Sequence, residues 1–297
     1  TFRGLKFRAN QALEKICSKI KTLDLKNIID LAMCLCGNLQ SLKICLQNGA
    51  DFNARNTKRQ TALHFAAMGS NVEVLEMTLG RMLNPNEKDS VNQTPLHVAE
   101  TVQVLLANKA STFLKDGGGN TALHASVLHN HIEVVKILLE KEANVDSNQT
   151  SGGYTCLHIA TEFGFLDLVN FLLLNSANPN ALTDLNRAPL HSTALNGHLE
   201  VLQVLIKYGA DVNLRVLDGC TSLHYAVETG REQVTLALLQ HGADPNICDK
   251  EIGNGPLHYA AQDGHEGHEH VIKFLIKIRL RLMQDTLMVP QHYKKLL

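Results

Sequence analysis

Apolar residues recur along the chain in pairs of short stretches with helical spacing, and a polar turn follows each pair. In residues 221–246 a turn at Gly230 separates the first stretch from the second, which spans Val234 to Leu239. The same order recurs in residues 189–213, where Gly197 marks the turn. Apolar positions at this spacing favour helices, and glycine favours the turn between them. The pattern predicts an all-α fold of repeated helical hairpins.

A short motif of the form T-x-L-H marks the start of these hairpins. It returns at intervals of 33, 27, 34, 33, 33 and 34 residues, with two variants that lack the threonine. A hairpin of this size cannot bury its apolar side alone, so neighbouring repeats must supply each other's core. The motif histidines are His64, His97, His124, His158, His191, His224 and His258.

These residues resemble the ankyrin repeat, whose pattern is T-P-L-H-x-A, then G-H-x-E-V-V-x-L-L, then G-A-D-V-N. The resemblance covers roughly residues 28–280 and implies an ankyrin-repeat solenoid of about eight stacked helix-turn-helix units with β-turn fingers. It divides the chain into an N-terminal helix or cap (1–27), the repeat domain (28–280) and a C-terminal capping segment or tail (281–297).

The resemblance also implies that the motif histidines are structural, because Thr and His at the start of the first helix tie adjacent turns by hydrogen bonds. We therefore expect neither metal binding nor catalysis from them. Ala188 and Gly255 stand where the motif has threonine, so the caps of these two helices are expected to be weaker.

Three repeats depart from the pattern. Upstream, Leu31 lies 33 residues before His64 in a degenerate first repeat, preceded by an amphipathic stretch at 9–21. The repeat at His97 lacks about six residues, so its first helix must be clipped or its turn tightened, either as a tolerated deletion or as a kink that shapes the binding surface. The repeat at His258 is longer and carries His265, His268 and His270, which suggest a duplicated exposed turn or, alternatively, a zinc or copper site.

Composition places the chain among globular proteins of a reducing compartment. Its seven cysteines are odd in number and irregularly spaced, which favours core thiols over disulfides. No apolar run reaches membrane-spanning length, and the first residues lack the apolar core of a secretion signal. We expect a cytoplasmic or nuclear location. The chain begins with Thr1 rather than Met, as would a piece of a longer protein.

The net charge of −1 conceals a division along the chain. Lys and Arg outnumber Asp and Glu by five in residues 1–26 and again in 273–297, whereas residues 27–272 are acidic. An acidic concave surface would favour a protein partner with a basic segment and would repel nucleic acid. The alternative is that soluble repeat surfaces are often acidic without a specific purpose.

The resemblance places the binding surface at the finger tips, four to seven residues before each motif histidine, and on the first helix, four and five residues after it. Met68, Leu128 and His129 occupy such helix positions. Apolar residues occupy several of these positions, which are expected to face water: Tyr154, Phe163, Leu185, Leu195, Leu217 and Ile252. The candidate partner-binding residues are Lys58, Val91, Tyr154, Glu162, Phe163, Leu185, Arg187, Leu195, Asn196, Leu217, Asp218, Glu228, Ile252 and Asp263.

The sequence carries no motif of a catalytic or cofactor site. It lacks the phosphate-binding G-x-x-x-x-G-K-[ST] pattern and the G-x-S-x-G pattern of hydrolases, and Gly117-Gly118-Gly119 falls in a finger. We expect a protein that is not an enzyme, binds no cofactor, and serves as a scaffold for protein–protein interaction.

Two narrower resemblances give alternatives. Residues 151–160, with Phe165-Leu166-Asp167-Leu168-Val169, look like one repeat of the inhibitors of NF-κB, which would imply cytoplasmic retention of a transcription factor. The tail 287–297 is similar to the end of a SOCS box, which would make the stack a substrate receptor of a ubiquitin ligase. The preceding helix lacks the L-C-R element of that family, so a C-terminal capping helix is the alternative interpretation.

Overall fold

The computed structural model describes residues 39–47, 51–69, 71–81, 83–149, 151–262, 272–273 and 275–277. Contacts between Cα atoms separate two compact parts, residues 1–151 (unit 1) and residues 152–297 (unit 2), and each is described by itself. Every regular element in the described residues is a helix. The predicted all-α repeat fold is confirmed.

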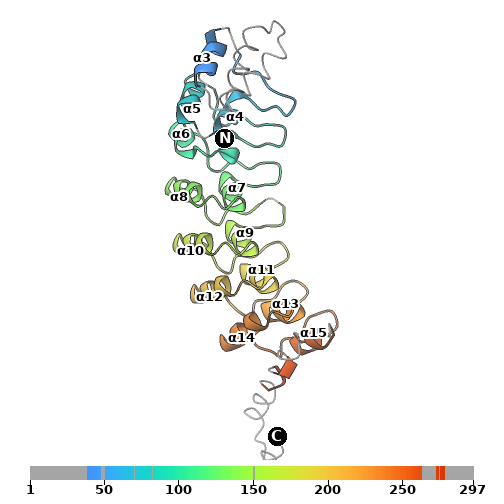
Figure 1. Ribbon diagram of the computed structural model, residues 1–297. Coiled ribbons are helices and arrows are strands. Elements are labelled where there is room, and N and C mark those ends of the chain that lie inside the picture. Colours follow the sequence, from blue (N-terminus) through green and yellow to red (C-terminus); the bar gives the residue numbers. More distant parts are fainter. Residues whose placement is uncertain are drawn as a thin grey trace, which may run out of the picture. The chain divides into compact units, whose positions relative to one another are not determined.

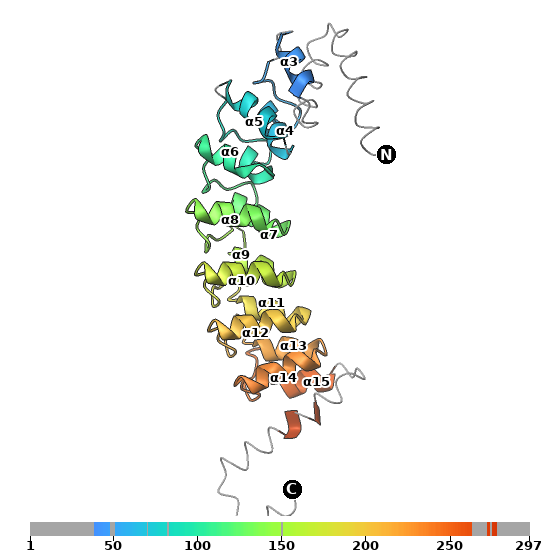
Figure 2. The same cartoon turned by 60° about the vertical axis from the view of Figure 1, so that its left-hand side comes forward.

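Unit 1 arranges its helices in two layers (Figures 1 and 2). The inner layer begins at the motifs and contains α4 (Ala62–Met68), the 3₁₀ helix η1 (Pro95–Val98) and α7 (Ala122–Leu128). The outer layer contains α3 (Leu39–Gln47), α5 (Val72–Leu79), α6 (Val102–Ala107) and α8 (Ile132–Glu140). Each inner helix packs on the outer helix that follows it, and η1 packs on both α4 and α7.

Unit 2 repeats the same arrangement with full-length helices. Its inner layer contains α9 (Cys156–Glu162), α11 (Pro189–Asn196), α13 (Ser222–Glu228) and α15 (Pro256–Gln262). Its outer layer contains α10 (Leu166–Leu174), α12 (Leu199–Lys207) and α14 (Glu232–Gln240). The turns that lead into the inner helices of this unit project to one side, and we call them fingers (Figure 1).

The space between the two layers holds the core. The motif leucines Leu157, Leu190 and Leu223 are at most 1% exposed, and Leu172 and Leu202 of the outer layer are fully buried. Burying a leucine side chain stabilises the fold by about 1.5–3 kcal/mol. One leucine at the same place in each repeat therefore fixes the register of the stack.

In unit 2 the turns from inner to outer helix contain a left-handed glycine, at position 164, 197 or 230. Gly197 ends α11 with φ 82°, and a Cβ there would approach the Cδ of Arg231 to 2.8 Å. A residue with a side chain would meet both backbone strain and a clash at this point. Glycine is therefore favoured at Gly197, and Asn130 takes the same left-handed conformation, with φ 56°, between α7 and α8.

The irregular repeats follow the sequence in part. The second helix of the degenerate first repeat is present as α3. In the short repeat the inner helix is clipped to the four residues of η1, and α6 has six residues against nine in α8. The stretch 9–21, Leu31, the histidines at 265, 268 and 270, and the tail 281–297 lie outside the described residues, so the expectations for them and the predicted domain bounds stay predictions.

Candidate partner-binding surface

The motif histidines tie the inner helices to their own caps and, in five repeats, to the next finger. In unit 2, His158 Nδ1 accepts from the backbone N–H of Thr155 at 3.2 Å and lies 2.9 Å from the Thr155 hydroxyl. Its Nε2 lies 2.9 Å from the carbonyl oxygen of Arg187 in the following repeat. A carbonyl only accepts and a backbone N–H only donates, so Nε2 carries the hydrogen and the ring is neutral.

The same pair of contacts recurs in four further repeats. The carbonyl that meets Nε2 belongs to Gln93 for His64, Asn120 for His97, Leu214 for His191 and Asn254 for His224. Burial is the main cause that lowers the pKa of all five rings, and it brings the pKa of His158 to about 4. Both nitrogens of each of these rings already have a partner, and the rings are uncharged at neutral pH. They therefore offer no free nitrogen that could bind a metal or transfer a proton.

Two repeats lack the threonine hydroxyl, as the sequence indicated. The N–H of Ala188 still donates to His191 Nδ1 at 3.0 Å, and the N–H of Gly255 donates to His258 Nδ1 at 3.1 Å. Neither residue has a side-chain oxygen, so each cap lacks the two hydrogen bonds that the Thr155 hydroxyl makes to the ring and to the backbone N–H of His158. His258 is also exposed, unlike the six other motif histidines.

The finger tips are held rigidly by short side chains at their bases. Asp249 Oδ1 accepts from the N–H groups of Ile252 and Gly253 at 3.0 and 2.9 Å. Asp218 Oδ1 accepts from the N–H of Cys220 at 2.9 Å, and Thr183 Oγ1 accepts from the N–H of Arg187 at 3.1 Å. Side-chain acceptors of this kind fix a tight turn, so the tip residues are presented in one conformation.

Neighbouring fingers of unit 2 are joined by backbone hydrogen bonds. The N–H of Leu217 donates to the carbonyl of Leu185 at 3.2 Å, and the N–H of Lys250 donates to the carbonyl of Asp218 at 2.7 Å. Leu185, Leu217 and Ile252 therefore lie at the tips of three successive, linked fingers. Their side chains are 62%, 50% and 75% exposed, and we call these three residues the tip row.

A cluster beside the last described finger is structural. The Tyr259 hydroxyl donates to Asp249 Oδ2 at 3.0 Å and lies 3.4 Å from Cys220 Sγ. The Tyr259 ring packs edge-on against His224. Burial raises the pKa of the Cys220 thiol to about 11. The thiol stays protonated at neutral pH and is a poor nucleophile.

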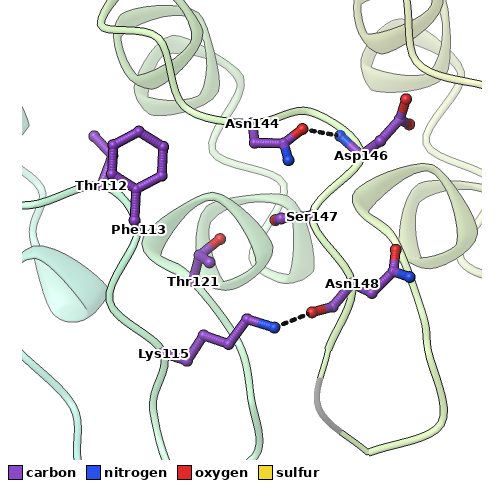
Figure 3. A pocket seen from close by; sticks show the side chains of 8 residues that line it. All are labelled: Thr112, Phe113, Lys115, Thr121, Asn144, Asp146, Ser147 and Asn148. Carbon is purple, nitrogen blue, oxygen red and sulfur yellow. Dashed lines mark hydrogen bonds between the residues drawn. The ribbon is translucent and has the colours of Figure 1, made fainter.

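A polar hollow of about 400 Å³ lies in unit 1 between residues 112–115 and 144–148 (Figure 3). The Lys115 amino group donates to the carbonyl of Asn148 at 2.5 Å, and the N–H of Asp146 donates to the side-chain oxygen of Asn144 at 3.0 Å. The first bond joins consecutive inter-repeat turns, and the second lies within one turn. The described lining of the hollow contains no histidine or cysteine. The hollow therefore lacks the side chains that usually serve as base and thiol in nucleophilic catalysis.

Within the described ranges, no three His, Cys, Asp or Glu side chains are grouped so that they could hold a metal ion. The search for long apolar helices in the same ranges found no candidate for a membrane span.

Comparison with known families agrees with this geometry. A family model described as ankyrin repeats (3 copies) matches residues 99–183 and 166–249, which together are more than half of the chain. A second, described as ankyrin repeats (many copies), matches residues 30–77 and 223–276. The chain belongs to the ankyrin-repeat family.

Several curated ankyrin-repeat relatives are similar over just over half of the chain. Inversin of Canis lupus familiaris is 29% identical over 187 residues, which are 59% of this chain and 17% of Inversin. B-cell lymphoma 3 protein homolog of Mus musculus is 30% identical over 175 residues, 56% of this chain and 39% of that protein. A protein named as a palmitoyltransferase, ZDHHC13 of Danio rerio, is 28% identical over 188 residues, 60% of this chain and 29% of that protein. The matched stretches thus span well under half of each relative.

Ankyrin repeats are generally a non-enzymatic module for protein–protein interaction, and most of the predicted contact residues lie on exposed surface. In unit 1, Lys58 and Val91 are exposed at finger tips. In unit 2, the tip row is accompanied by exposed Asp218, and the ends of the inner helices expose Glu162, Phe163, Asn196 and Glu228. Asp263 lies outside the described residues.

Three of the predicted contact residues are less accessible than the sequence suggested. Tyr154 is half-buried because its ring packs edge-on against His158, with ring centroids 5.7 Å apart. Leu195 is also half-buried. The guanidinium of Arg187 lies over the ring of Tyr225, 5.4 Å from its centroid, which restricts its freedom to meet a partner.

The sequence positions taken from the family missed some exposed apolar residues of the ankyrin stack. Leu174 is 69% exposed at the end of α10, and Phe113 is 65% exposed beside the polar hollow. Both lie outside the finger tips and the inner helices. Their apolar character alone could not distinguish them from core residues in the sequence.

Proposed function

We propose that unit 2 binds a protein partner through the tip row, with the exposed ends of its inner helices as a second contact. The observation that carries the proposal is the placing of Leu185, Leu217 and Ile252 at successive linked tips, each at least half exposed. Exposed aliphatic residues held in one rigid row favour binding, because little conformational freedom is lost on association.

The charges beside the tip row support a partner with basic side chains around an apolar core. Asp184, Asp218 and Glu251 are exposed at the same fingers, and the nearby Lys250 amino group donates to the carbonyl of Leu217 at 3.1 Å. An acidic rim speeds association with a basic surface and disfavours acidic ones. A cytoplasmic or nuclear protein with such a segment is the partner we propose.

Replacing the tip row by serine tests this function. The variant Leu185→Ser, Leu217→Ser, Ile252→Ser should lose at least about 100-fold in affinity for its partner, because apolar anchors contribute about 2 kcal/mol each. Its melting temperature should change little, since the side chains are exposed. The measurement is affinity purification of the tagged protein from cells with quantitative mass spectrometry, paired with a thermal melt.

Leu174→Ser provides the control, because Leu174 is equally exposed but lies on the outer layer. It should retain every partner that the unchanged protein captures. Retention of the same partners by the triple variant would refute the proposed surface.

A second candidate function is retention of a transcription factor in the cytoplasm. The stretch that resembles the inhibitors of NF-κB covers the turn before α9, most of α9 and the start of α10 in unit 2. The similarity to B-cell lymphoma 3 protein homolog covers 175 residues and is compatible with this alternative. A ubiquitin-ligase adaptor stays a prediction from the tail, and co-purification of elongin and cullin subunits would test it.

A further inference from the structure

The shortened repeat of unit 1 leaves a groove in the inner layer. Its inner helix η1 has four residues, whereas α4 and α7 on either side have seven. A hollow of about 530 Å³ lies there, lined by residues of all three elements. A neighbouring hollow of about 310 Å³ shares Glu100, His131 and Val134 with it, and we call the two together the short-repeat groove.

Apolar side chains form part of the lining of the short-repeat groove, together with the polar Gln93, Asn120 and Ser126. Met68 and Leu128 stand four residues after His64 and His124, at the last positions of α4 and α7, and are 39% and 47% exposed. The matching residue of the short repeat is Thr101, which lies beyond the end of η1 as the N-cap of α6. No side chain of η1 therefore stands at the position between Met68 and Leu128. The small residues Ala99, Ala122 and Ala125 also line the hollow.

The rim of the groove is acidic. Glu100 follows η1, and its backbone N–H donates to the carbonyl of Ala67 at 3.1 Å, which fixes its place. Its exposed carboxylate has no hydrogen bond or ion pair to any described residue. Asp116, Glu133, His129 and His131 also line the two hollows, and their described linings contain no lysine or arginine. Glu133 is paired with Lys136 at 2.7 Å.

We propose that the short-repeat groove binds a lysine or arginine side chain carried by an apolar–basic segment of a protein partner. The aliphatic stem of such a side chain can lie over apolar surface while its charged end stays at the rim. Met68 can adapt to different stems, and Glu100 supplies the opposite charge. An acidic segment would be repelled. This site lies in unit 1 and is separate from the tip row proposed above.

Labelled peptides test the chemistry of the occupant directly. The full chain is titrated with a short fluorescent peptide of Leu-Lys-Ser repeats and with two others in which Ser replaces Leu or Glu replaces Lys. We expect the first peptide to bind at least about tenfold more tightly than either of the others. Equal binding of the Ser-Lys peptide would reduce the interaction to charge alone and overturn the proposal, as would the absence of binding by the Leu-Lys peptide.

A blocking variant locates the site. Ala125 stands one residue after His124, where other repeats carry Phe65, Tyr225 and Tyr259, so Ala125→Tyr places in the groove a side chain that this fold already accommodates elsewhere. It should weaken binding of the Leu-Lys peptide at least about tenfold. The double variant Met68→Ser, Leu128→Ser changes two exposed side chains and should do the same if the tyrosine variant fails to fold.

Matched controls separate the groove from the rest of the surface. Glu100→Gln should weaken binding about threefold at low salt, whereas Glu76→Gln, which removes an exposed charge from α5, should not. Phe113→Ser, which changes an exposed apolar residue outside both proposed surfaces, should bind the peptide like the unchanged protein. Unchanged peptide binding by both the blocking variant and the double variant would overturn the proposal for the short-repeat groove. That result would not contradict the function proposed for the tip row of unit 2.

Discussion

Replacing His158 by alanine is expected to destabilise the protein by more than about 3 kcal/mol. The substitution leaves the Thr155 N–H without its acceptor. It also removes the ring from the Thr155 hydroxyl and the Arg187 carbonyl, which keep the backbone N–H groups of residue 158 and Thr183 as partners. Thr155 is only 1% exposed, so water cannot take the place of the ring. Each buried polar group left without a partner costs about 1–3 kcal/mol, and the empty ring volume adds a cavity cost.

The same substitution at His258 is the matched control. This ring is exposed, and its Nδ1 accepts from the N–H of Gly255 at 3.1 Å. No carbonyl of a following repeat contacts it within the described residues. We expect His258→Ala to cost less than about 1 kcal/mol. Urea unfolding of both variants measures the difference, and equal midpoints would show that the buried network does not determine stability.

Mild acid should destabilise the folded chain strongly. His64, His97, His158, His191 and His224 have pKa values lowered by burial, and that of His158 falls from 6.5 to about 4. Between those values the unfolded chain binds more protons than the folded chain, so the free energy of unfolding falls as pH decreases from about 6.5 towards 4. Above about pH 6.5 the histidines are neutral in both the folded and the unfolded chain, so this loss of stability does not occur.

The expected loss of stability in acid is large because several repeats each contain a buried histidine. His158 alone contributes about 3 kcal/mol over the whole window, more than half of it lost by pH 5. The four other rings act in the same direction. Urea titrations at pH 7 and pH 5 and constant ionic strength measure the change before most carboxylates titrate. A free energy of unfolding that is equal at the two pH values, or larger at pH 5, would be incompatible with neutral buried rings.

The sequence predicted the regular part of this fold because the same residues recur at a fixed period. Six of the seven motif leucines are at most 2% exposed, and Leu257 is half-buried. Four of the inner-to-outer turns contain a left-handed residue, which is Asn130, Gly164, Gly197 or Gly230. The sequence could not decide how the short repeat closes, since a clipped helix and a tightened turn both absorb a deletion. The structure shows that the helix is clipped, because η1 keeps the buried Leu96 and His97 and ends directly after them.

The binding surface was predicted less completely than the fold. Tip positions such as Leu185 follow from counting residues back from the motif. The half-burial of Tyr154 and the stacking of Arg187 on Tyr225 depend on neighbours that the period alone does not identify. The motif also matches equally well at His158 and His258, although His158 is buried against the carbonyl of Arg187 and His258 is exposed.

The most direct test of the proposed function is site-specific crosslinking in cells. A photoreactive phenylalanine analogue is placed at Leu217 in the tip row or at Leu174 on the outer layer, both of which are at least half exposed. Our account predicts that the probe at position 217 forms a discrete crosslink to a protein partner and that the probe at position 174 does not. A partner crosslinked from position 174, with none from position 217, would contradict it.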